Sequence, residues 1–399
     1  MCVGPYNPRV AIATPSSVDE WLDRLRNLAP LVEQYRDEGE RERRLPQALF
    51  QALRDAGFFS LWVPRNLGGA EVDVETSMRV VEELSRLDGA VGWNVMIAGN
   101  TSILWANLAP EVTADMLRER PGHVIAGTVT SGSGTAYPVS GGGFRVTGRW
   151  PFASGCQQAD WLVSVCHIVD DGQPRRAPDD TPQPYTFVLP ATDCEIVDTW
   201  DTVGMRGTGS HDFQVDDVFV PAGRHFVARG GRSYQSGPLY NTTFYHLWAP
   251  NIAAVALGIA RAAIDLFVEL AATKKPSRSA VVLAQRETVQ EKVGQAEALV
   301  RTSRAFLYDT VRQTWPLLVA GQPIPEQLTA LNRLAASTAV EYCNAAVDLV
   351  FTMSGTTSVY TRGRIERCFR DVHVVRQHAV VSPNGVIQAG RQFLGLGLS

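Results

Sequence analysis

The feature that most constrains this chain is the spacing of its apolar residues, which changes twice along the sequence. From about residue 17 to 120 the spacing is helical, as in Val18, Trp21, Leu22, Leu25 and Leu28. From about 122 to 225 helical spacing disappears, and short alternating segments predict strands: GGFRVTGRW, WLVSVCHIV, YTFVLP and FQVDDVFVP. From about 243 onward helical spacing returns over three long stretches. This order predicts an α+β protein that is mostly α.

We therefore expect three domains. Residues 1–120 are predicted to form an N-terminal helical domain, 121–230 a middle β domain, and 231–399 a C-terminal four-helix bundle. The Pro- and Asp-rich stretch 170–184 is predicted to be an exposed hairpin loop. Long helices with Ala-rich faces often continue their packing across a subunit boundary, so we also expect a homo-oligomer, as a tetramer.

Charge, cysteines and missing motifs exclude several classes of function. A net charge of −4 argues against a nucleic-acid-binding surface, and no run approaches the ~18 apolar residues of a membrane span. The N-terminal segment lacks the basic and apolar regions of a secretory signal. The six cysteines are scattered without a CxxC pair, so we expect no metal site or disulfide framework and a cytoplasmic location. GxGxxG, GxxxxGK[ST], HExxH and GxSxG are all absent.

Four segments are candidates for chemistry, and each has a simpler explanation. GRWPFASG (148–155) combines aromatic residues with Ser154, but a β domain also uses aromatics as core and Ser in turns. TVTSGSGTA (128–136) and GMRGTGSHDF (204–213) offer backbone amides to a heterocycle or phosphate, yet most such loops are only loops. MSGTTSVY (353–360) precedes IERCFRDVHVVRQH, in which Arg370 and Asp371 are expected to form a charge pair. His373 and His378 are five residues apart, so on a helix they point in different directions, and an isolated histidine is usually structural.

In this order and spacing, these segments resemble the acyl-CoA dehydrogenase fold over nearly the whole chain. LPQALFQALRDAGFFSLWVPRNLGG and VVEELSRLDGAVGW are similar to its N-terminal helical domain. GRWPFASG resembles the strand and turn at its flavin, VGMRGTGSHDFQVDDVFVP the end of its middle β domain, and IERCFRDVHVVRQH the late Arg-Asp segment of its bundle. The resemblance implies a flavoprotein with the three-domain layout described above.

Within that fold, the chain resembles the two-component flavin-dependent monooxygenases more than the dehydrogenases. The dehydrogenases place a glutamate base after the Arg-Asp pair, but residues 376–382 contain no carboxylate; other members place it in the bundle, where this chain has Gly258. The resemblance implies an oxygenase component that uses reduced flavin and O2, through a C4a-hydroperoxyflavin, to hydroxylate an aromatic, phenolic or polycyclic small molecule. FMNH2 is favoured and FADH2 is an alternative. A separate NAD(P)H:flavin reductase is the implied partner, with flavin passing by diffusion.

The resemblance also assigns roles to residues. Ser154 corresponds to a hydroxyl near the reactive flavin nitrogen, and His378 is the expected acid or base, with His373 as second choice. The other expected flavin contacts are Thr128, Phe152, Thr208, Ser210, Ser354, Gly355 and Thr356. The expected substrate contacts are Trp93, Asn100, Tyr245, His246 and His373. The remaining alternatives are an N- or S-oxygenase of the same fold, such as an amino-sugar N-oxygenase, an acyl-CoA dehydrogenase or oxidase with an unplaced base, and a non-catalytic scaffold.

Overall fold

The computed structural model describes residues 14–129, 134–228, 231–277 and 279–398. The N-terminal part consists of helices α1 (Val18–Glu42), α2 (Gln47–Asp55), α3 (Val74–Leu87), α4 (Gly89–Ser102) and α5 (Pro110–Glu119). All residues of α4 are buried, so this helix has no polar face and no amphipathic pattern. Asp88 begins α4, because its Oδ1 accepts hydrogen bonds from the backbone N–H groups of Ala90 and Val91 at 2.9 and 3.1 Å.

Nine strands in the described part of the chain form the middle sheet. They are β1 (Ile125–Gly127), β2 (Gly134–Pro138), β3 (Phe144–Trp150), β4 (Trp161–Asp170), β5 (Gln173–Pro174), β6 (Pro184–Pro190), β7 (Glu195–Val197), β8 (Asp212–Val220) and β9 (His225–Val227). Their order is β7-β8-β3-β2-β4-β6-β9, with β1 and β5 also paired to β4. The stretch 170–184, expected to be an exposed hairpin loop, contains β5, which pairs antiparallel with β4, and an antiparallel bridge between Arg176 and Pro182.

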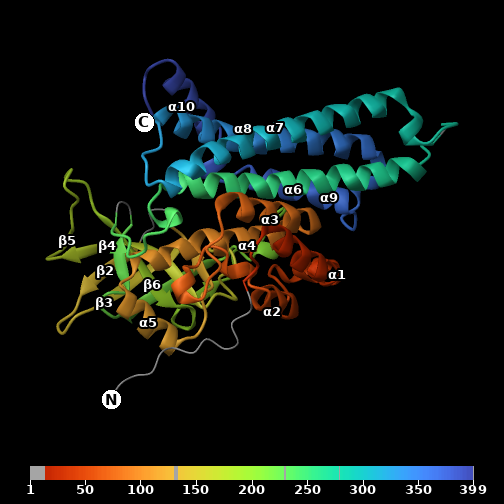
Figure 1. The fold of residues 1–399 in the computed structure, drawn as a ribbon. Coiled ribbons are helices and arrows are strands. Elements are labelled where there is room, and N and C mark those ends of the chain that lie inside the picture. Colours follow the sequence, from red (N-terminus) through yellow and green to blue (C-terminus); the bar gives the residue numbers. More distant parts are fainter. Residues whose placement is uncertain (1–13, 130–133, 229–230, 278, 399) are drawn as a thin grey trace.

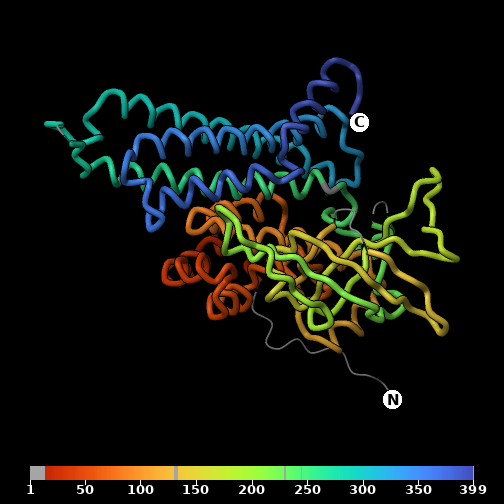
Figure 2. Tube along the Cα trace, turned by 180° about the vertical axis from the view of Figure 1, so that it is seen from behind, coloured from red at the N-terminus to blue at the C-terminus, as the bar shows by residue number. Residues whose placement is uncertain are grey.

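The C-terminal part is helical, as expected. Its helices are α6 (Phe244–Thr273), α7 (Glu287–Val319), α8 (Glu326–Ser354), α9 (Arg364–Val375) and α10 (Asn384–Phe393). In Figures 1 and 2, α6, α7 and α8 run side by side above the N-terminal helices and the sheet. Helix α6 is long and apolar enough to cross a membrane, but 78% of its most apolar window is buried inside the molecule, as in a core helix.

The predicted mostly helical α+β class is confirmed. The elements change type between Glu119 and Ile125 and again between Val227 and Phe244. One hydrophobic core extends from Trp21 through α3, α4 and α6 to Val381, whereas the sheet has a core of its own around Trp150 and Phe213. The three-domain division itself stays a prediction, because the N-terminal and C-terminal helices share one core.

Candidate active site

Three segments that are distant in sequence meet at Ser154, and a fourth lies against Trp93. Trp93 comes from α4, Ser154 from the turn after β3, Thr208 and Ser210 from the turn η5 (Arg206–Thr208) and its continuation, and His378 from the segment after α9. The turn after β3 is held to this continuation by two backbone hydrogen bonds, Ala153 N–H to His211 O and Gly155 N–H to Thr208 O, both 2.9 Å. The structure thus brings together five of the residues that the sequence assigned to flavin, substrate or catalysis.

The polar centre of this site is a line of hydrogen bonds. Trp93 Nε1 donates to Ser154 Oγ at 3.0 Å, and Ser154 Oγ lies 2.6 Å from Ser210 Oγ. Ser210 Oγ lies 2.7 Å from Thr208 Oγ1, which donates to the carbonyl of Met205 at 2.8 Å. Ser154, Ser210 and Thr208 are at most 6% exposed. We call these three residues the hydroxyl chain.

Aromatic rings surround the hydroxyl chain. The Trp93 ring meets His378 edge-on, with centroids 5.7 Å apart. Phe152 meets Trp200 edge-on at 6.2 Å, yet 69% of Phe152 is exposed. Its backbone has a φ of 61°, a strained value for a residue other than glycine. An exposed aromatic ring held at a strained position beside a buried hydroxyl fits a planar ligand.

His378 is neutral in this environment. Burial lowers its pKa from the ordinary 6.5 to about 4. Its Nδ1 accepts a hydrogen bond from Val380 N–H at 3.3 Å, so the neutral ring carries its proton on Nε2. The ring can therefore donate a hydrogen bond to a ligand at neutral pH. The sequence suggested an acid or a base at this position, and that role stays a prediction.

The other two candidate histidines have protein partners. His373 points toward α8, where its Nε2 lies 3.0 Å from Asp348 Oδ1. His246 contacts the hydroxyls of Thr242 and Thr243 through Nδ1 and that of Thr329 through Nε2. Burial and the nearby Arg333 lower the pKa of His246 to about 4. These contacts hold both rings in place within the fold.

The remaining predicted substrate contacts also lie in polar surroundings of their own. Asn100 is fully buried and accepts a hydrogen bond from Asn251 Nδ2 at 2.9 Å, and Asn251 also donates to Ser77. The Tyr245 ring lies under the Arg333 guanidinium, 4.1 Å from its centroid. Substrate contact by Asn100, Tyr245, His246 or His373 stays a prediction.

The segment predicted for the flavin phosphate lies at a different end of the molecule. Ser354 and Gly355 end α8, where Lys274 Nζ binds the Ser354 carbonyl and the Thr357 hydroxyl, both at 2.6 Å. Lys274 caps the end of α6, which in Figure 1 lies far from the sheet. Within one chain, Ser354, Gly355 and Thr356 therefore lie apart from the site around Ser154, and their contact with flavin stays a prediction. Thr128 follows β1, while residues 130–133 of the same loop lie outside the described residues.

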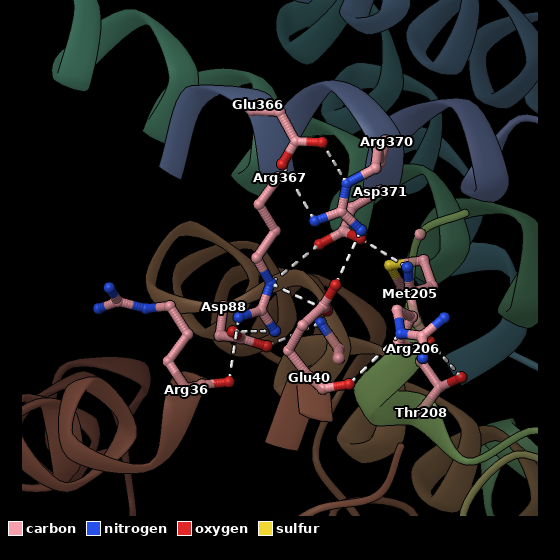
Figure 3. Close-up of polar contacts among 12 residues, drawn as sticks. Arg36, Glu40, Asp88, Met205, Arg206, Thr208, Glu366, Arg367, Arg370 and Asp371 are labelled. Carbon is pink, nitrogen blue, oxygen red and sulfur yellow. Dashed lines mark hydrogen bonds and ion pairs between the residues drawn. The ribbon is translucent and has the colours of Figure 1, made fainter. Parts of the chain in front are cut away.

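A cluster of buried charges lies behind the site and joins α1, α4 and α9 (Figure 3). Arg367 Nη2 lies 2.9 Å from Asp88 Oδ2, and its Nε lies 3.7 Å from Asp371 Oδ2. Asp371 Oδ1 accepts the Met205 N–H at 2.5 Å. The adjacent Arg370 binds Glu40 and Glu366, so the charge pair expected between Arg370 and Asp371 is replaced by these partners. Successive side chains on a helix point about 100° apart, so Arg370 and Asp371 face different partners.

Burial dominates the electrostatics of this cluster. It raises the pKa of Asp371 to about 7, although the positive charge of Arg367 opposes the shift. The carboxylates around Arg367 hold its pKa above the usual range. The raised pKa of Arg367 therefore depends on Asp88 and Asp371 staying close to its guanidinium. In the described residues, no group of three or more His, Cys, Asp or Glu side chains is arranged to hold a metal ion.

Sequence reasoning missed Trp200, Met205, Asp88 and Arg367. Met205 is buried and has a φ of 53°, so its position between Gly204 and the GTGS run was the one available signal of an unusual turn. Asp88 is 279 positions before Arg367, and no local pattern connects them. These residues support the site and are recognisable only from the fold.

Comparison with known proteins places this geometry in context. Residues 17–115 match the family model described as acyl-CoA dehydrogenase, N-terminal domain, and 251–383 the model for the C-terminal domain. The chain is 33% identical to indole-3-acetate monooxygenase of Pseudomonas putida over 388 residues, 97% of this chain and 96% of that protein. It is 29% identical to the flavin-dependent monooxygenase oxygenase subunit HsaA of Mycobacterium tuberculosis, covering 90% of each. XiaF from Streptomyces sp., solved with FADH2 and glycerol, superposes with a TM-score of 0.88 at 28% identity, covering 96% of each chain.

Proposed function

Because this chain belongs to the acyl-CoA dehydrogenase family, among relatives that are flavin-dependent monooxygenases, we propose that it is the oxygenase component of a two-component system that hydroxylates an aromatic small molecule. The resemblance to this family seen in the sequence motifs is confirmed. The observation that carries the proposal is the buried Ser154 hydroxyl beside Trp93 and the neutral His378. When bound, reduced flavin supplies the electrons with which O2 is activated for oxygen transfer.

The residues at the site fit a flavin, and each has a different role toward it. Ser154 offers a hydrogen-bonding oxygen at the end of a buried hydroxyl chain. Phe152 offers an exposed ring as a wall against water. His378 offers its Nε2–H as a hydrogen-bond donor to an oxygen atom of the ligand.

The site also lacks what a dehydrogenase needs. Helix α9, which precedes His378, carries the carboxylates of Glu366 and Asp371, and each of them forms an ion pair with an arginine. Gly258 lies against α3, where a Cβ would come within 2.1 Å of the Glu82 carbonyl oxygen, so no side chain fits there. A glutamate base is therefore missing from both places where the dehydrogenases carry one.

The finer parts of the proposal concern flavin type, partner and assembly. We expect reduced FMN to serve, with FADH2 as the alternative that the XiaF complex supports. A separate NAD(P)H:flavin reductase delivers the flavin, by diffusion or in a transient complex. We also expect a homotetramer and a cytoplasmic location. If Ser354, Gly355 and Thr356 contact a flavin at Ser154, a second copy must supply them, because they lie at the end of α8 away from the sheet.

The test supplies reduced flavin from an independent reductase, under 18O2, with indole-3-acetate as the first of a panel of aromatic probes. The proposal predicts a hydroxylated product that contains one 18O atom, and reoxidation of reduced flavin at a rate that the protein changes. Ser303→Ala, which removes a buried serine hydroxyl on α7 that donates to the Val300 carbonyl, serves as control for Ser154→Ala. Bleaching of bound oxidised flavin by an acyl-CoA, or reoxidation that the protein leaves unaltered, would contradict the proposal. Size-exclusion chromatography with light scattering checks the tetramer.

A further inference from the structure

A cavity between α1 and α9 is lined mainly by arginines, and none of its lining residues belongs to the site around Ser154. Its volume is about 320 Å³, and its charged lining residues are Arg26, Arg36, Glu33 and Arg364. The side chains of Arg26 and Glu33 are 65% and 70% exposed, whereas that of Arg36 is 12% exposed. The cavity therefore has a rim in solvent and a largely buried guanidinium inside it.

The charges around this cavity do not balance. Its lining carries three positive charges and one negative charge, and Arg36 already binds that one carboxylate, with Nη2 3.1 Å from Glu33 Oε1. Arg364 donates to the Leu87 carbonyl at the end of α3, at 3.3 Å, and forms no ion pair with any carboxylate in the described part of the chain. The cavity therefore has a net positive charge.

Arg36 and Arg364 both keep donors that the protein does not use. A guanidinium has five N–H groups, and Arg36 has one carboxylate partner, while its Nε has no hydrogen-bond partner. Burial, and after it the positive charge of Arg36, lowers the pKa of Arg364 below its usual value. The two cations come from different helices and repel each other across the cavity, so an anion between them would be attracted by both.

We propose that this cavity binds a phosphate, either as the free ion or as a phosphate monoester. The forked N–H groups of arginine match the oxygens of such an ion in pairs. A tetrahedral oxyanion also has acceptor oxygens on several sides, so it can meet guanidiniums from both helices, whereas a carboxylate has two oxygens in one plane. The inference goes beyond the proposed function and does not depend on it.

A phosphate at this position would strengthen the contact between α1 and α9. The Arg36 carbonyl accepts a hydrogen bond from Arg367 Nη1 at 3.0 Å, and Arg364 precedes Arg367 by one turn of α9. In Figure 3 the Arg36 carbonyl faces Arg367, while its guanidinium points away from the buried cluster. Because the ion binds only where both helices are in place, it should raise the unfolding temperature.

The test titrates the full chain with inorganic phosphate in a calorimeter, with chloride replaced at constant ionic strength. We expect saturable binding, together with an unfolding temperature that rises with phosphate and not with chloride. Arg36→Gln and Arg364→Gln should each weaken binding about tenfold, as expected for loss of a charge-assisted hydrogen bond. Arg312→Gln, which removes an exposed arginine paired with Glu75, is the matched control and should bind as the wild type does.

Two milder variants answer the question if these do not fold. Arg26→Gln changes only the exposed rim and should weaken binding about two- to threefold. Arg364→Lys keeps the charge but loses the fork, so its affinity should fall between those of the wild type and Arg364→Gln.

Glycerol phosphate, titrated in the same way, distinguishes the two sources of the ion. Tighter binding than that of inorganic phosphate would identify a monoester site, and weaker binding a site for the free ion. Absence of saturable phosphate binding in the wild type would overturn the inference. Binding that stays unchanged in folded variants of Arg36 and Arg364 would also overturn it, because the phosphate would then lie elsewhere.

Discussion

At the scale of single residues, the site contains two residues whose backbone conformation is strained and is held by the surrounding fold. Phe152 and Met205 both have positive φ values, of 61° and 53°, on either side of the hydroxyl chain. Such conformations cost about 1–3 kcal/mol each and persist where the surroundings enforce them. Phe152 gains little from burial, since it is 69% exposed. Burial of its ring therefore contributes little to stability, and the ring is accessible to a ligand.

Replacing Phe152 by glycine tests this directly. Glycine accepts a positive φ without strain and loses only the Trp200 edge contact, so we expect unchanged stability or a gain of about 1 kcal/mol. Flavin affinity should fall at the same time, because the aromatic wall is gone. Thermal unfolding and flavin titration measure the two effects, and Phe152→Ala, which keeps the strain, is the matched control. A large loss of stability would show that the ring is structural.

The lowered pKa of His378 predicts how the free energy of unfolding changes with pH. Its folded-state pKa of about 4 lies below the ordinary 6.5, so the unfolded chain binds a proton in that interval and the folded chain does not. Its neutral form therefore contributes stability above pH 6.5 that is lost as the pH falls toward 4. Between pH 7 and pH 4, the free energy of unfolding of the wild type should fall by about 2 kcal/mol more than that of His378→Gln. Urea titrations at several pH values measure this, and a pH-independent difference would place the ring in solvent.

Replacing His378 by alanine, which has no donor, reports on chemistry. Without the Nε2–H donor, we expect less product and more hydrogen peroxide per reduced flavin consumed, with flavin binding nearly intact. His373→Ala, on the face of α9 toward Asp348, should remain coupled. A fully coupled His378→Ala would contradict the donor role.

At the scale of elements, one arginine links three helices and a loop. Arg367 on α9 donates to the Arg36 carbonyl of α1, binds Asp88 at the start of α4, and faces Asp371, which holds Met205 (Figure 3). The hydrogen bonds at the site run from Trp93 on α4 to Met205. The Arg367 guanidinium is thus connected to both ends of this line, through Asp88 at the start of α4 and through Asp371, which binds Met205. The relative position of α4 and the 203–210 loop depends on it.

Arg367→Met should therefore cost about 3–5 kcal/mol, because it leaves two buried carboxylates without a counter-charge. Asp371 has a pKa raised to about 7, and its protonated form needs no cation. A carboxyl with a raised pKa loses stability as the pH rises, so the deficit should be larger at pH 8 than at pH 5.5. Denaturation at both pH values checks this. Arg312→Met, which breaks an exposed pair with Glu75, should cost below about 1 kcal/mol at either pH.

At the scale of the whole molecule, α6 joins the N-terminal helices to the bundle within a single core. Gly258 allows the close approach of α6 to α3, because a Cβ there would meet the Glu82 carbonyl oxygen. The N-terminal helices and the bundle should consequently unfold together.

Gly258→Ala tests that packing. A Cβ at this position would lie 2.1 Å from the Glu82 carbonyl and 2.7 Å from Ser85 Cβ, so the helices must separate. We expect a loss of about 2–3 kcal/mol in a single cooperative transition. Gly294→Ala on α7, whose Cβ would meet nothing within 4 Å, should instead stabilise by about 0.5–1 kcal/mol. Calorimetry and circular dichroism follow both, and an unaffected Gly258→Ala would refute the close packing.

The order of helices and strands, and the family, were predictable from the sequence because both depend on local patterns. Apolar periodicity marks amphipathic helices and half-buried strands, and GRWPFASG and IERCFRDVHVVRQH were sufficient to single out Ser154 and His378.

The fully buried α4, the hydroxyl chain and the Asp88–Arg367–Asp371 cluster were not predictable in this way. A helix buried on all sides has no periodicity, and Trp93 is 61 residues before Ser154. Likewise, Arg370 and Asp371 are neighbours in sequence but have different partners, since helix geometry turns them apart. Hydrogen-bond direction and charge pairing depend on contacts between distant segments, so they exist only once the chain has folded.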